Sequence, residues 1–186
     1  WMAVPVLLKL RFGVTEVIST LLLNFVAEAA VSWAVSGPMQ EPTHVYPQSA
    51  AIAASAQLPK LLPGARLHLG LVLAVLVAVG LMVLLRKTRW GFELRAVGAG
   101  PRAAEVSGGI RSGRLLAVAL LASGALAGLG GAVEVSGVSY ALYLNLSPGY
   151  GFTAIAVALL GRLQPLGVVI AGVLFGALEA GAGAMQ

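Results

Sequence analysis

Two long stretches without a single charged residue constrain the fold most strongly. They cover residues 67–85 and 115–133, and charged residues flank both. A helix needs about twenty mainly apolar residues to cross the roughly 30 Å hydrocarbon layer of a membrane, and each stretch meets that length. With 59% hydrophobic and 10% charged residues, the chain has too few charges to cover a soluble protein of this size. We therefore predict an all-α fold, a polytopic bundle of transmembrane helices.

Three further apolar stretches bring the expected number of membrane segments to four or five. Residues 13–35 form a span that two glutamates and an asparagine interrupt, and residues 166–184 form another. Residues 150–161 are too short to cross alone, and a turn-forming sequence follows them at 161–165. The short segment is either a half-helix or re-entrant element, or the first arm of an ordinary helical hairpin.

Basic residues indicate which loops face the cytoplasm. The net charge is +5, but seven of the twelve basic residues lie in the loop 86–114, whereas the proline-rich loop 36–66 has only Lys60 and Arg66. Because cytoplasmic loops are enriched in Lys and Arg, we place the loop 86–114 inside and the loop 36–66 outside. This distribution indicates membrane topology and no nucleic-acid partner. Since the chain begins at Trp1 without a methionine, we interpret it as a fragment.

The basic loop has the sequence features of an organised unit. Pro101 suits the first turn of a short helix, and Gly108 or Gly109 can close that helix in the left-handed conformation. Ala103 and Ala104 give such a helix a smooth patch that the groove of a partner protein could approach. We therefore expect a helix over residues 101–107 that docks on a partner.

The residues of this loop resemble the cytoplasmic coupling motif of ATP-binding cassette (ABC) importer permeases of the branched-chain amino acid and ribose group. The nearest similarity is to nucleoside permeases that work with basic-membrane-lipoprotein binding proteins, and residues 12–24, 123–131 and 151–161 are similar as well. By this resemblance, the coupling residues are Gly91, Phe92, Arg95, Gly98, Pro101, Ala103, Ala104, Gly109 and Ile110. Two departures are Gly100, where the group usually has asparagine, and the doubled Gly108 and Gly109, which leave the register of the motif open.

The resemblance implies that residues 1–186 are part of one transmembrane permease domain in a bacterial cytoplasmic (inner) membrane, surrounded by lipid. Its expected partners are a cytoplasmic ABC ATPase subunit, a second permease subunit, homologous or identical, and an extracytoplasmic substrate-binding lipoprotein. ATP and Mg²⁺ would bind the ATPase, and this chain would bind no cofactor. The chain shows no Gly-x-x-x-x-Gly-Lys-Ser/Thr phosphate-binding loop, because the glycines near Gly98 and Gly100 lack the following lysine and hydroxyl residue. The expected cargo is a small polar solute: a nucleoside, or otherwise a simple sugar or branched-chain amino acid.

Polar residues within the expected spans are candidates for the solute path, since such groups tend to face the bundle interior or water. The candidates are Glu16, Thr20, Asn24, Glu28, Glu134 and Phe152. Glu16 and Glu134 could instead lie at helix ends among lipid headgroups, and aromatic residues near Phe152 could be ordinary interfacial residues. An ion-coupled secondary transporter would use the same buried carboxylates and remains the alternative function.

The composition argues against catalytic and metal sites. The chain has no cysteine and no aspartate, and its two histidines, His44 and His68, have no ligand-spaced companions. An intramembrane hydrolase would need a nucleophile with a base, or two aspartates. We predict neither a catalytic residue nor a metal site.

Overall fold

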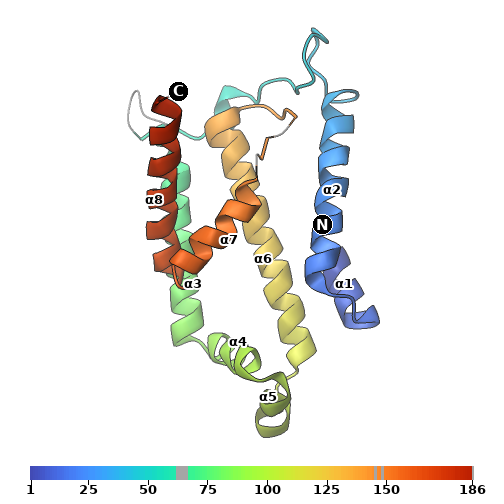
Figure 1. Cartoon of the computed structure of the whole chain (residues 1–186), viewed down its shortest axis with the longest axis vertical. Coiled ribbons are helices and arrows are strands. Elements are labelled where there is room, and N and C mark those ends of the chain that lie inside the picture. Colours follow the sequence, from blue (N-terminus) through green and yellow to red (C-terminus); the bar gives the residue numbers. More distant parts are fainter. Residues whose placement is uncertain (62–66, 145, 148, 186) are drawn as a thin grey trace. The chain divides into compact units, whose positions relative to one another are not determined.

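The computed structural model describes residues 1–61, 67–144, 146–147 and 149–185 (Figure 1). The elements in chain order are α1 (Ala3–Phe12), α2 (Glu16–Val35), the 3₁₀ turn η1 (Ala54–Ala56), α3 (Leu69–Lys87), α4 (Arg89–Ala99), α5 (Pro101–Gly108), α6 (Ser112–Glu134), the π-helical turn η2 (Val135–Ser139), α7 (Tyr150–Leu160) and α8 (Pro165–Ala184). Helices α2, α3, α6 with η2, and α8 are each long and apolar enough to cross a membrane. The predicted all-α, polytopic fold is confirmed.

The first span is shorter than predicted, because the non-helical residues 13–15 separate it from the preceding helix α1. The backbone of Gly13 is left-handed, with φ of 68°, and its N–H donates to Lys9 O, so α1 ends there. Thr15 is extended, and α2 begins only at Glu16. The prediction of one apolar span over residues 13–35 was therefore wrong at its start.

The described residues form two compact units, of which the first contains residues 1–68 and 93–146. In this unit α1 packs against both α2 and α6. The contact with α6 depends on Gly124, since a Cβ there would overlap the side chain of Met2. A small residue thus lets another helix approach closely, as is common between membrane helices.

The far end of α6 widens into the π-helical turn η2, and the segment 49–58 is hydrogen-bonded to it and to the residues that follow. Leu58 N donates to Ser136 O at 2.8 Å, Ile52 N to Tyr140 O at 2.8 Å, and Ser49 N to Leu142 O at 2.7 Å. A π-turn changes the regular backbone hydrogen bonding of a helix, and here carbonyl groups in and after the turn accept from the loop. Within the first unit, α6 therefore has α5 at one end and the loop 36–61 at the other.

The second unit contains residues 69–92 and 147–186, and α8 packs there against α3 and α7. The turn between α7 and α8 is tight: Arg162 and Leu163 are both left-handed, and a Cβ on Gly161 would overlap the backbone of Gly167 and Val168. The first arm, α7, has 11 residues and is about 16 Å long, roughly half a hydrocarbon layer. The segment is thus a tight helical hairpin whose first arm is too short to span.

Candidate functional site

The loop 86–114, which its positive charge predicts to face the cytoplasm and which we call the inner loop, begins with a sharp junction between α3 and α4. The Thr88 hydroxyl donates to Leu84 O at 2.6 Å and accepts the N–H of Gly91 at 3.2 Å, so Thr88 caps α4. Gly91 is buried, and a Cβ there would overlap the backbone of Leu84 and Leu85. Only glycine allows α4 to begin this close to the end of α3.

Helix α5 has the end groups that its sequence predicted. Pro101 occupies its first turn after an extended Gly100, and Gly109 ends it in the left-handed conformation with φ of 60°. The Gly109 N–H donates to Glu105 O and the Ile110 N–H to Ala104 O. Gly108 is the last helical residue, so of the two glycines it is Gly109 that turns the chain.

The two alanines of α5 have opposite environments. Ala104 is buried, with 8% of its surface exposed, whereas Ala103 is exposed. The expectation of a smooth patch made by both alanines was wrong for Ala104, because that side of the helix packs against the chain itself. Glu105 accepts a hydrogen bond from Ser112 Oγ at the start of α6.

The outward side of α5 carries an apolar residue that sequence reasoning missed. Val106 is 89% exposed and lies three residues after the exposed Ala103 and four after the exposed Arg102. Residues three and four apart share a helix face. We call Arg102, Ala103 and Val106 the exposed face of α5. Helical spacing groups these three residues on one face. The sequence did not show that this face, and not the one with Ala104, is exposed.

The other expected coupling residues lie mostly at the surface. Phe92 is 62% exposed, Arg95 and Gly98 are exposed, and Ile110 is partly exposed. Gly91 and Phe92 belong to the unit that contains α3, and the remaining coupling residues belong to the unit that contains α6.

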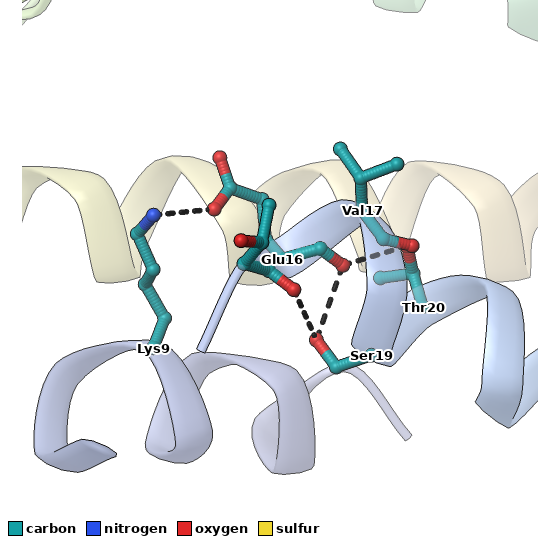
Figure 2. A network of polar contacts seen from close by, with 6 residues as sticks. Lys9, Glu16, Val17, Ser19 and Thr20 are labelled. Atoms are coloured by element: carbon teal, nitrogen blue, oxygen red, sulfur yellow. Dashed lines mark hydrogen bonds and ion pairs between the residues drawn. The ribbon is translucent and has the colours of Figure 1, made fainter. Parts of the chain in front are cut away.

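The first solute-path candidate, Glu16, lies at the beginning of α2. Its Oε2 atom is shielded from solvent and lies 2.6 Å from Lys9 Nζ of α1. Figure 2 shows this ion pair. The Thr20 hydroxyl donates to Glu16 O at 2.8 Å, and that of Ser19 does so at 3.1 Å. Glu16 therefore has the helix-end environment that the sequence left as an alternative, and its ion pair links α1 to α2.

Asn24 and Glu28 lie deep in the same helix. Asn24 Nδ2 donates to Glu28 Oε1 at 3.1 Å. The middle of α2 falls between Phe25 and Val26, and at 1.5 Å per residue both polar groups are within about 4 Å of it. Both side chains are exposed. Among the described residues, this is the one pair of candidates whose side chains are hydrogen-bonded to each other.

The last two candidates belong to other helices. Glu134 is the final residue of α6, and Phe152, 67% exposed, is in the first turn of α7 in the other unit. Among the described residues, no three His, Asp or Glu side chains form a group that could hold a metal ion.

The part of the chain that the structure describes contains four apolar helices of spanning length and a structured basic segment between two of them. These are features of a multi-pass membrane protein. The whole chain, residues 1–186, matches the family described as the branched-chain amino acid transport system / permease component. The protein belongs to this family of ABC transporter permeases, in the cytoplasmic membrane.

The relatives are permease subunits, the transport components of ABC transporters. The glucose ABC transporter permease protein TsgB13 of Haloferax volcanii is 40% identical over 196 residues, which cover 100% of this chain and 51% of the relative. The guanosine ABC transporter permease protein NupP of Bacillus subtilis is 39% identical over 186 residues, or 98% of this chain and 53% of the relative. The nucleoside ABC transporter permease protein NupB of Lactococcus lactis is 33% identical over 195 residues, or 98% and 52%. The chain thus spans about half the length of these relatives, and no solved structure matches it.

Proposed function

We propose that this chain is the membrane-embedded part of a permease subunit of an ATP-driven importer for a small neutral polar solute, with a nucleoside as the first candidate. The observation that carries the proposal is α5: a short, capped helix in the basic loop, tied to α6 by the Glu105–Ser112 hydrogen bond and presenting an exposed face. A loop needed only for membrane topology would require neither the left-handed cap at Gly109 nor the buried Ala104.

In this proposal the exposed face of α5 contacts a cytoplasmic ATPase subunit, which binds ATP and Mg²⁺. The apolar side chain of Val106 is suited to a groove of the partner, since a desolvated apolar anchor contributes more to binding than a rim charge. The small Ala103 beside it allows close approach. Because α5 is hydrogen-bonded to the first turn of α6, movement of α5 would pass directly to a spanning helix.

The proposed solute class rests on the polar groups of α2 and on the relatives. Asn24 and Glu28 place hydrogen-bonding groups in mid-span, which suits the hydroxyl and N–H groups of a nucleoside or a sugar. Nucleoside and guanosine permeases are among the relatives, and a glucose permease, at 40% identity, supports a sugar as the second candidate.

The test is transport by the full-length protein, reconstituted in vesicles with its ATPase and binding protein. We expect ATP-dependent uptake of at least one solute from a panel of guanosine, adenosine, uridine, glucose and leucine. Uptake that needs no ATP and follows an imposed proton or sodium gradient would instead establish the ion-coupled alternative and overturn the proposal. Guanosine uptake without glucose uptake, or the reverse, decides between the two solute classes.

A further inference from the structure

The polar residues of α2 are spaced at every fourth position along the whole helix. After Glu16 they are Thr20, Asn24, Glu28 and Ser32, and Ser36 then ends the helix. The other residues of α2 are apolar except for Ser19 and the indole group of Trp33. We call Thr20, Asn24, Glu28 and Ser32 the polar ridge.

The ridge is continuous and winds slowly around the helix. Each step of four residues advances about 6 Å along the axis and rotates about 40° around it. The ridge thus covers about 18 Å of depth within an arc of about 120°. Ser19 is separate from it, because that side chain is buried.

The polar groups of the ridge are costly to place against lipid, and this cost indicates what surrounds them. The Asn24–Glu28 hydrogen bond uses one carboxylate oxygen, and the structure records no partner for Glu28 Oε2 among the described residues. A carboxylate and an amide near the middle of a span are costly against hydrocarbon, so such groups face protein or water. At the inner end, the ion pair with Lys9 satisfies Glu16, but among the described residues no such cation accompanies Glu28.

We propose that the polar ridge of α2 is one wall of the aqueous solute path, and that this wall selects unphosphorylated solutes rich in hydroxyl and N–H donors. This inference rests on the proposed function and adds Ser32 to the residues predicted from the sequence. Carboxylate, amide and hydroxyl oxygens accept hydrogen bonds from such donors. The negative charge of Glu28 repels a phosphate group.

Cysteine labelling tests the ridge, because residues 1–186 contain no cysteine, and any cysteine in the rest of the importer is replaced beforehand. Asn24→Cys and Glu28→Cys are compared with Val26→Cys in the full-length importer with its partners, using a membrane-impermeant charged methanethiosulfonate. Val26 lies midway in depth between the two ridge positions and about 160° around the helix from each. It is 52% exposed, which makes it a matched control.

We expect both ridge cysteines to react at least about tenfold faster than Val26→Cys, since a thiol must be in water to form the reactive thiolate. Equal rates at the three positions, or faster labelling at Val26, would overturn the inference. A second pair, Thr20→Cys against Leu22→Cys, has the same separation around the helix and replaces any variant that does not accumulate in the membrane.

Solute protection tests the selectivity of the wall. Guanosine and glucose are compared with guanosine monophosphate and glucose 6-phosphate at equal concentrations. We expect a transported solute to slow the labelling of Asn24→Cys more than that of the double variant Glu28→Gln, Asn24→Cys. Its phosphorylated form should not protect Asn24→Cys and should protect the double variant, because the repelling charge is gone there. Protection of Asn24→Cys by the phosphorylated form would refute the selectivity.

Labelling and uptake together separate this inference from the proposed function. If ridge cysteines label but no panel solute is taken up with ATP, the proposed importer fails while the aqueous wall stands. If a panel solute is taken up with ATP but the ridge cysteines do not label, the importer stands and the aqueous wall fails.

Discussion

The loops on the two sides of the spans are both structured, but by different forces. The inner loop, residues 86–114, is shaped by close packing and backbone caps: buried Gly91, buried Ala104 and left-handed Gly109. The loop 36–66 is predicted to lie outside, and we call it the outer loop. Its described part, residues 36–61, contains a turn built around one carboxylate. The contrast suggests that side-chain volume limits substitution in the inner loop, whereas charge and protonation matter in the outer one.

The outer turn is centred on Glu41. Gln48 Nε2 donates to Glu41 Oε2 at 2.7 Å, and Thr43 Oγ1 donates to Glu41 Oε1 at 2.8 Å. The Glu41 N–H in turn donates to Gln48 O at 2.8 Å, which closes the turn through the backbone. Val45 and Tyr46 at its tip are 66% and 62% exposed, so apolar burial contributes little there.

The largest expected effect is at the α3–α4 junction. Gly91→Ala would place a methyl group against the backbone of Leu84 and Leu85, which cannot move aside as a side chain could. We expect a loss of about 3 kcal/mol in stability, the upper part of the range for overpacking. The thermal unfolding midpoint of the full-length protein in detergent measures it.

Gly98→Ala is the matched control on the same helix. Nothing lies within 4 Å of a Cβ at Gly98, and alanine is favoured over glycine inside a helix by roughly 0.5–1 kcal/mol. The unfolding midpoint should stay the same or rise. An equal fall for both variants would show that α4 is sensitive to any substitution, and the packing account of the inner loop would be wrong.

The next effect separates the two sides of α5. Ala104→Leu should lower stability by about 1–2 kcal/mol, because the buried position has no room for the larger side chain. Val106→Asp, on the exposed face, should leave the unfolding midpoint unchanged and weaken copurification of the ATPase, since a buried charge would face the partner's apolar groove. If Val106→Asp retains normal copurification, the exposed face is not the contact surface.

The sequence predicted the spans well because an uninterrupted apolar run of sufficient length has few other structures available. The sequence also predicted α5, because Pro101 and Gly109 define its ends through local backbone geometry. It could not distinguish Ala103 from Ala104, since two adjacent alanines have the same local preferences and only tertiary packing makes one of them buried. Asn24 and Glu28 became candidates because polar side chains within a membrane span are energetically costly. The hydrogen bond between them could be seen only in the structure.

Other features depended on contacts between distant residues. Gly137 lies in η2. A Cβ on this residue would overlap the ring of His68, which directly precedes α3. No local pattern predicts such a contact, and the π-turn was missed. Helix α4 was missed because its arginines and glycines interrupt the apolar periodicity that marks a helix.

The smallest effect is expected at the outer turn, as a dependence on pH. Hydrogen bonds from Gln48 and then Thr43 hold the pKa of Glu41 below its ordinary value of 4.5. A group whose pKa is lower in the folded protein stabilises it fully above the unfolded pKa, and this contribution is lost as the pH falls through the folded pKa. The turn should therefore be unaffected between about pH 6 and about pH 8, well above the pKa of a free glutamate, and loosen only in acid.

Hydrogen exchange over residues 40–49, corrected for the intrinsic effect of pH, checks this prediction. Glu41→Gln should raise exchange at neutral pH, because an amide lacks the charge that strengthens the bonds from Gln48 and Thr43. In acid, below the folded pKa, the natural protein should approach the variant, while peptides from α6 serve as the internal control. If the two proteins exchange alike at neutral pH, the carboxylate does not hold the turn, and packing would govern the outer loop as it does the inner one.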